Sequence, residues 1–349
     1  MCEETKTALM LSPEEMQPAA VLLERMVAEL GGMLLGQSEL HKLVLTGVLS
    51  RGHILLEGVP GVGKTALVKA LGQLMNLEFK RIQMTPDLMP GDIVGSHILE
   101  DAAGGRREMR FQPGPVFTNI LLADEINRAS PKTQSALLEA MQERCVTLLG
   151  TTRPLPNPFF VLASQNPIEM EGTYPLPEAQ LDRFLFKLIV PNPEAEVLDA
   201  IISTRRRGEP PPPTWSISRE ELLSTFALMD RILMPKAVSR YISRLVEVTH
   251  PTSANTIDIV KDYVSYGASP RAAIAMAESS RAYALLANRP TVGFEDIKAV
   301  TPHVLNHRLI LNYRARFDGV SVFDVITRIL EQVKAVDLGL PDDVEAEGV

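Results

Sequence analysis

The sequence predicts an α/β fold in which helices cover a parallel sheet, followed by a helical region. Short apolar runs alternate with stretches of helical periodicity, and strands buried on both faces read as such continuous runs. A glycine-rich loop stands between the first run and a helix, and only helical patterns follow residue 190. The predicted strands span residues 53–57, 79–83, 119–123, 159–163 and 185–190.

Residues 1–34 contain the first predicted helix. Ser12 offers an N-cap side chain, Pro13 suits the first helical position, and two glutamates place negative charge in the first turn. Apolar residues recur at helical spacing from 16 to 30, and the glycine pair 31–32 predicts the end. This helix should therefore bury one face.

Residues 35–208 form the predicted α/β core, which two hairpin-like inserts interrupt. The first insert, 85–117, has Gly104-Gly105 between its two arms, and the second, 146–158, turns around Gly150. A polar, proline-rich connector leads us to place the domain boundary near 208. Helical patterns at 220–231, 236–248, 271–286 and 320–333 predict a helical domain over 209–334, and we expect the tail 335–349 to be disordered.

The charge balance argues against a broad positive surface for nucleic acid. Five acids lie in the tail after Lys334, and without them the formal net charge of −8 becomes −3. We therefore do not expect nucleic acid as a partner. The locally basic Arg106, Arg107 and Arg110 in the first insert keep a DNA-binding alternative open, with a solvated hairpin as the other explanation.

Cysteine usage and hydropathy exclude further classes of protein. Cys2 and Cys145 lie far apart without a Cys/His cluster, so neither a disulfide framework nor a zinc site is indicated. No uncharged stretch reaches the roughly 20 residues of a membrane span, and Glu3 and Glu4 replace the apolar run of a signal peptide. We expect no membrane insertion and a cytoplasmic location.

The glycine-rich loop fits the phosphate-binding pattern G-x-x-x-x-G-K-[ST], and it has the strand–loop–helix context that the pattern needs. Backbone N–H groups can wrap a phosphate, Lys64 can reach the β- and γ-phosphates, and the Thr65 hydroxyl can bind Mg²⁺. A chance glycine-rich turn is the alternative. The predicted nucleotide-binding residues here are Gly58, Val59, Pro60, Gly61, Val62, Gly63, Lys64, Thr65 and Ala66.

Two carboxylates end the third apolar run, at the sheet edge where a parallel fold also places the loop. Asp124 would hold the Mg²⁺ shell together with Thr65, and Glu125 would orient or deprotonate an attacking water. Taken alone, the pair could equally cap a helix or face solvent.

Several linked blocks then resemble the MoxR family of AAA+ ATPases, closely over about residues 35–195 and more loosely to about 315. The blocks are DEINRA at 124–129, PKTQ at 131–134, LLEAM at 137–141, QNP at 165–167, EGTYPLP at 171–177 and QLDRF at 180–184. The resemblance implies a P-loop NTPase core of the AAA+ type with a small helical lid. It also implies a hexameric or similar homo-oligomeric ring that remodels a partner protein.

The resemblance assigns roles at five further positions, and three of these roles have an alternative. Asn166 is similar to the sensor that orients water, or it caps a turn. Arg183 is similar to an arginine finger offered to the neighbouring subunit, or it pairs with an adjacent acid. Arg271 is similar to the second sensor in the lid, or it is an ordinary first-turn residue. Gly36 and Gln37 lie where the family places part of its adenine pocket.

The hypothesis that follows is an ATPase motor, with ATP and Mg²⁺ as cofactors and a von Willebrand factor A domain protein as a partner implied by the resemblance. The second hypothesis is a nucleotide-switched assembly scaffold with little turnover. The third is a translocase on nucleic acid like the MCM helicases, which predicts DNA-stimulated hydrolysis. No metalloprotease pattern occurs among the six histidines, which we interpret as structural or surface residues.

Overall fold

The computed structural model describes residues 11–102, 106–168, 172–205 and 209–334, which fall into two compact units. One unit is Arg25–Leu223, and the other combines the described residues up to Glu24 with those from Ser224. The predicted turn at 104–105, the start of the 171–177 block and the predicted tail 335–349 lie outside the described residues. The predicted boundary near 208 stays a prediction.

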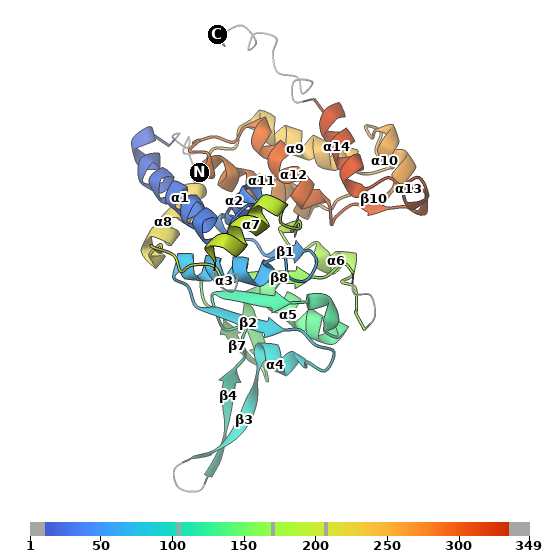
Figure 1. Ribbon diagram of the computed structural model, residues 1–349. Helices are drawn as coiled ribbons and strands as arrows, with labels where there is room; N and C mark the ends of the chain where they lie inside the picture. The colour runs from blue at the N-terminus through green and yellow to red at the C-terminus, as the bar shows by residue number, and fades with distance from the viewer. Residues whose placement is uncertain (1–10, 103–105, 169–171, 206–208, 335–349) are drawn as a thin grey trace, which may run out of the picture. The chain divides into compact units, whose positions relative to one another are not determined.

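A five-stranded parallel sheet is the centre of Arg25–Leu223 (Figure 1). Its order is β2-β5-β8-β1-β9, so the loop after β1 and the ends of β5 and β8 meet at one edge. All five predicted strands are confirmed, with ends shifted by no more than two residues. They are β1 (Ile54–Glu57), β2 (Phe79–Gln83), β5 (Ile120–Asp124), β8 (Phe160–Gln165) and β9 (Phe186–Ile189).

Apolar side chains of the strands, α5 (Pro131–Glu143) and the neighbouring loops form a buried core in this unit, whose helices are given below. Leu121 of β5, Leu137 of the following helix and Phe184 are fully buried in one cluster, and burying each such side chain contributes about 1.5–3 kcal/mol. The helices are α2 (Ser38–Leu49), α3 (Lys64–Met75), α4 (Pro90–Val94), the 3-10 helix η1 (Ile126–Arg128), α5 (Pro131–Glu143), α6 (Glu178–Leu181) and α7 (Ala195–Thr204).

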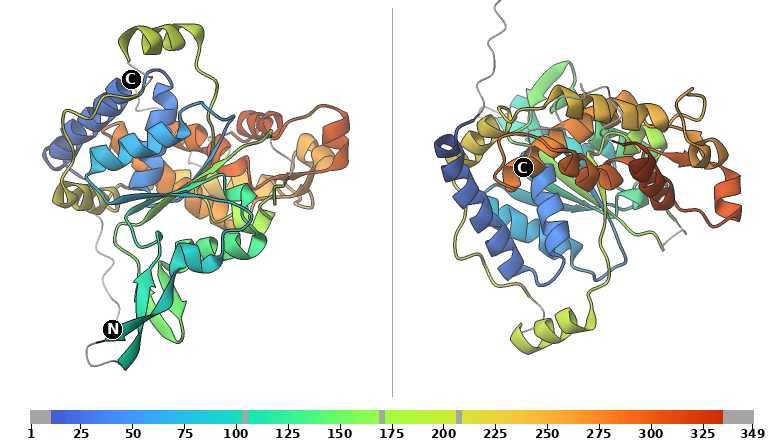
Figure 2. Two further views of the ribbon diagram at one scale, coloured as in Figure 1. Left: turned by 60° about the horizontal axis from the view of Figure 1, so that its bottom comes forward. Right: turned by 90° about the horizontal axis from the view of Figure 1, so that it is seen from above.

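Both predicted inserts contain antiparallel hairpins. The first is β3 (Gly95–Ala102) with β4 (Arg106–Pro113), and the second is β6 (Cys145–Leu148) with β7 (Thr151–Pro154). Figure 2 shows the β3–β4 hairpin extending away from the sheet with the second hairpin beside it. The guanidinium carbon of Arg153 lies 4.0 Å from the ring centroid of Phe111, which joins the two hairpins by a cation–π contact.

The second unit is mainly helical. Helix α11 packs against α9 and α12, and the buried ring of Tyr241 meets that of Phe294 edge-on at 5.4 Å. The sequence predicted only helices here, but a short antiparallel pair, β10 (Val264–Tyr266) and β11 (Ile310–Leu311), is also present, too short to leave an apolar run. The helices are α9 (Lys236–Val248), α10 (Asp258–Tyr263), α11 (Pro270–Leu286), α12 (Phe294–Leu305), α13 (Tyr313–Phe317) and α14 (Val322–Gln332).

The two boundaries between the units, at Glu24/Arg25 and at Leu223/Ser224, fall inside helices. These helices are α1 (Pro13–Met33), which continues through the predicted glycine stop by one residue, and α8 (Arg219–Met229). Along the part of the chain that the structure describes, no helix has both the length and the apolar character needed to span a bilayer.

Candidate functional site

The glycine-rich loop connects the end of β1 to the start of α3. Gly61 and Gly63 have φ angles of +87° and +92°, in the left-handed region that glycine adopts without strain. A Cβ at either position would meet no atom within 4 Å. The backbone conformation therefore requires glycine at these positions, while the space above the loop stays open for a ligand.

Lys64, the first residue of α3, is buried at the base of this loop. Its Nζ donates to the carbonyl oxygen of Gly58 and, at 3.3 Å, to that of Gln165. Burial lowers the pKa of Lys64, while the nearby charges of Asp124 and Glu125 act in the opposite direction. The loop thus holds a desolvated cation beside its backbone N–H groups, as phosphate binding requires.

The structure brings together the two residues predicted to hold a metal. Thr65 Oγ1 donates to Asp124 Oδ2 at 3.4 Å, and Ser164 Oγ on β8 donates to the other oxygen, Oδ1. Two hard oxygen donors suit Mg²⁺, which usually takes few protein ligands and completes its shell with phosphates and water. Among the described residues no three His, Cys, Asp or Glu side chains gather as a metal site.

Glu125 follows Asp124 in a left-handed conformation, with φ 58° and ψ 53°, which is uncommon for a residue other than glycine. Its backbone N–H donates to Ser164 Oγ at 2.8 Å. Its Oε2 accepts hydrogen bonds from Gln83 Nε2 at 2.8 Å and from Arg128 Nη1 at 2.9 Å. The predicted catalytic carboxylate is thus fixed by two side-chain donors of its own subunit.

Sequence reasoning missed Arg81 and Gln83, which β2 brings to these acids. Arg81 binds Asp124 Oδ2 through Nε at 3.1 Å and through Nη2 at 2.7 Å, and Nη2 also donates to Gln83 Oε1 at 3.0 Å. Because β2 pairs with β5 in the register Gln83↔Asp124, both side chains reach the carboxyl end of the sheet. The sequence offered one signal: Arg81 and Gln83 are polar residues at alternate positions of a strand that was predicted to be buried.

A mostly apolar pocket of about 300 Å³ adjoins the loop. Gln37, which has a φ of 56°, donates its side-chain amide to the Pro191 carbonyl at 3.0 Å, and Gly36 has a φ of 72°. The predicted residues Gln37, Gly61, Val62, Gly63 and Ala66 line this pocket. Its other walls come from Leu34, Leu35, Leu40, His41, Leu67, Val190, Pro193, Val197, Leu198, Ile201, Arg205 and Pro210.

Asn166 lies directly after β8, between the ends of β5 and β1, and is buried. Its Oδ1 accepts the backbone N–H of Ile168 at 3.1 Å. This contact is the turn-capping role that the sequence left open. Its position beside the acids is also compatible with the sensor role, which stays a prediction.

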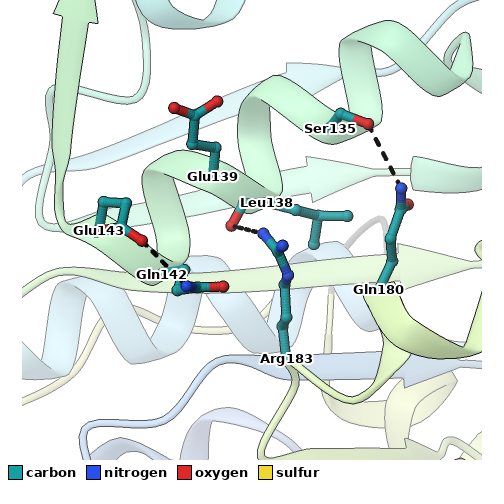
Figure 3. Close-up of a pocket in the computed structure, with 7 residues that line it drawn as sticks. All are labelled: Ser135, Leu138, Glu139, Gln142, Glu143, Gln180 and Arg183. Carbon is teal, nitrogen blue, oxygen red and sulfur yellow. Dashed lines mark hydrogen bonds between the residues drawn. The ribbon is translucent and has the colours of Figure 1, made fainter.

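Arg183 lines a separate pocket of about 270 Å³, against the C-terminal half of α5. Figure 3 shows Arg183 and Gln180 reaching toward this helix: Arg183 Nη1 donates to the Leu138 carbonyl at 2.8 Å, and Gln180 Nε2 lies 3.4 Å from Ser135 Oγ. This hydrogen bond joins Arg183 to a backbone carbonyl, whereas the sequence alternative was an ion pair with an adjacent acid. Arg183 does not line the pocket beside the glycine-rich loop.

Arg271 belongs to the second unit, at the start of α11. Ser269 caps this helix by accepting the Arg271 N–H at 3.2 Å, and Pro270 occupies the first position. The Arg271 side chain is exposed. Its predicted sensor role stays a prediction.

Two family models match the chain. The model described as "ATPase family associated with various cellular activities (AAA)" matches residues 53–186, and the "AAA lid domain" model matches residues 257–329. The first match contains the glycine-rich loop, the two acids and Arg183, and the second lies within the mainly helical unit.

Relatives extend this similarity over most of the chain. Chaperone MoxR1 of Mycobacterium tuberculosis is 46% identical over 89% of this chain and 81% of its own length. Protein MoxR of Methylorubrum extorquens is 32% identical over 91% of this chain and 95% of its own. A crystal structure from Cytophaga hutchinsonii, of a protein named as a candidate ATPase, matches with a TM-score of 0.82 at 40% identity, covering 92% of this chain and 97% of that one.

Proposed function

This chain belongs to the MoxR family of AAA+ ATPases, and we propose that it binds ATP with Mg²⁺ and hydrolyses it. The observation that carries the proposal is the approach of Thr65 Oγ1 to within 3.4 Å of Asp124 Oδ2. These residues lie 59 positions apart in sequence, Thr65 in the first turn of α3 and Asp124 at the end of β5, and the fold unites them beside an open phosphate-binding loop. That arrangement suits a phosphate ester carrying a divalent cation.

Each residue has a role that its position supports. The loop N–H groups and Lys64 bind the phosphate oxygens, and Thr65 and Asp124 hold the cation. When bound, Mg²⁺ supplies positive charge against the β- and γ-phosphate oxygens. Glu125 accepts a hydrogen bond from the attacking water and so orients it, because phosphoryl transfer depends mainly on positioning and charge stabilisation.

The test compares Glu125→Gln with the matched variant Glu220→Gln. Glu220 is an exposed acid on α8 and is assigned no role in the site. Glu125→Gln should keep ATP affinity within about threefold of wild type and lose at least 100-fold in turnover, while Glu220→Gln should keep both. Equal turnover in wild type and Glu125→Gln would remove Glu125 from the mechanism.

We propose further that the protein works as a homo-oligomeric ring, a hexamer by analogy with the family, in which Arg183 serves the site of the neighbouring subunit. Arg183 contacts α5 through the Leu138 carbonyl and does not line the pocket of its own loop, which supports this arrangement. An arginine supplied in trans is worth about 10³–10⁵ in turnover.

Mixing experiments test the ring. Arg183→Ala mixed into wild type should lower turnover per wild-type subunit, and dilution should lower it as well. Arg231→Ala, which removes an exposed arginine paired with Glu15 at 2.7 Å, is the mixing control. A rate that is independent of concentration and of mixing would show that each subunit acts alone.

The proposed output is chaperone-like remodelling of a partner that carries a von Willebrand factor A domain. Support comes from family membership, since one relative bears the name Chaperone MoxR1. Capture of such a purified domain should depend on ATPγS. Assembly without turnover would favour the scaffold hypothesis, and DNA-stimulated hydrolysis would favour the translocase.

A further inference from the structure

Thr65 and Arg81 both contact the same oxygen of Asp124, the one predicted to bind the metal. Oδ1 accepts a hydrogen bond from Ser164, so Oδ2 is the oxygen that faces Thr65 and that a cation would use. Arg81 already binds this same Oδ2 with two nitrogen donors, at 3.1 and 2.7 Å. A guanidinium on a carboxylate is a strong, charge-assisted contact, and here it covers the predicted metal position.

We propose that Arg81 is a competing internal cation at the metal site: it neutralises Asp124 while the site is empty and must leave Oδ2 when Mg²⁺ and nucleotide bind. The inference rests on the function proposed above. It assigns to Arg81 a positioning role that regulates affinity for the divalent cation and takes no part in the chemistry.

The surroundings of Arg81 make such a release feasible. Its side chain is 49% exposed, whereas that of Asp124 is 10% exposed, so the arginine can move into solvent while the carboxylate stays fixed. Solvent also weakens the pair, since ion pairs with an exposed partner contribute little stability. The planar guanidinium can turn away on its flexible stem without moving the backbone of β2.

Release of Arg81 also reaches Glu125. Arg81 Nη2 donates to Gln83 Oε1, and the amide nitrogen of the same Gln83 side chain donates to Glu125 Oε2. When Arg81 leaves Oδ2, Gln83 loses the contact that orients its amide. The occupation of Asp124 is therefore coupled to the restraint on the predicted catalytic carboxylate through one side chain.

The experiment measures cation affinity directly. Fluorescence of bound mant-ATPγS at fixed micromolar concentration is followed while free Mg²⁺ is titrated from micromolar to millimolar levels. Arg81→Ala should lower the half-saturating Mg²⁺ concentration by about five- to tenfold, as loss of a half-exposed, charge-assisted competitor predicts. Arg231→Ala is the matched control, because it removes an arginine of 52% exposure that pairs at the same 2.7 Å, and it should leave the titration unchanged.

A double-mutant cycle locates the effect. In an Asp124→Asn background, Arg81→Ala should shift the Mg²⁺ titration by less than twofold, since Arg81 acts through that carboxylate. Circular dichroism confirms that each variant is folded, and Arg81→Lys, which keeps the charge, should shift the titration less than Arg81→Ala.

The outcomes separate this inference from the proposed function. If wild type binds mant-ATPγS at no Mg²⁺ concentration, the proposed function fails. If wild type shows Mg²⁺-dependent binding and Arg81→Ala has the same or a higher half-saturating concentration, the function stands and the competing role of Arg81 is overturned.

Discussion

Gln83 restrains Glu125. The amide Nε2 at the end of β2 donates to Glu125 Oε2 at 2.8 Å, and Arg128 adds a second donor to the same oxygen at 2.9 Å. The carboxylate that we propose to orient water is therefore engaged by its own subunit before any substrate arrives. Each donor competes with the water for that oxygen.

Replacing Gln83 with methionine tests this restraint. Methionine keeps the length of the side chain but cannot donate, so Glu125 loses one partner and becomes more available to water. We expect Gln83→Met to raise basal turnover about two- to fivefold, measured by phosphate release at saturating ATP. Gln112→Met, at an exposed position of β4, is the control and should leave turnover unchanged. Lower turnover in Gln83→Met would mean that the bond supports catalysis instead.

Lys64→Met separates ligand binding from folding. The lysine is buried and its pKa is lowered chiefly by desolvation, so removing it costs the apo protein little, whereas the bound phosphates lose their main cation. The apo melting temperature should stay within about 2 °C of wild type, and stabilisation by ATPγS with Mg²⁺ should disappear. Lys69→Met, one turn along α3 and exposed, should keep that stabilisation. A full ligand shift in Lys64→Met would contradict the assignment of the loop.

The strands and the loop could be predicted because their signals are local. Continuous apolar runs mark β1, β5 and β8, which are almost fully buried, and the glycines of the loop adopt backbone angles that other residues avoid. The expectation of a buried apolar strand is wrong for β2, an edge strand with the sequence FKRIQ of which only Ile82 is buried. The approach of Thr65 to Asp124 could be predicted as well, because parallel strands bring their carboxyl ends to one edge.

The contacts made by Arg81 and Gln83 could not be predicted in the same way. They depend on β2 lying next to β5 in a particular register, and a sequence pattern does not give strand order. The contact of Arg183 with the Leu138 carbonyl could not be predicted either, because any of several acceptors can bind a guanidinium.

The two hairpins should move together because Arg153 stacks on Phe111. A partly exposed cation–π contact contributes about 0.5–1 kcal/mol. Arg153→Ala should therefore speed amide hydrogen exchange in both hairpins about two- to fivefold, measured by mass spectrometry. Arg110→Ala removes an exposed pair with Glu100 within the first hairpin and should leave the second unaffected. Faster exchange in only one hairpin would show that they are independent.

His53 makes the stability of Arg25–Leu223 depend on pH. Its Nδ1 accepts the Val161 N–H at 3.0 Å, so its Nε2 carries the proton and donates to the Met141 carbonyl at 3.1 Å. Burial lowers the pKa of His53 to about 4, partly offset by the Met141 bond. Below about pH 6.5 the unfolded chain binds a proton that the folded chain does not, so stability falls as pH falls toward 4.

Trp215 allows this effect to be measured, because it is the only tryptophan of the chain and lies in the same unit as His53. Urea unfolding followed by its fluorescence should show a loss of about 2 kcal/mol between pH 7 and pH 5 that is absent in His53→Gln. His53→Gln should be less stable at pH 7 but depend less on pH, and the exposed His250→Gln should keep the wild-type slope. A slope unchanged by His53→Gln would show that other groups of this unit carry it, among them His41, whose pKa is also lowered by burial.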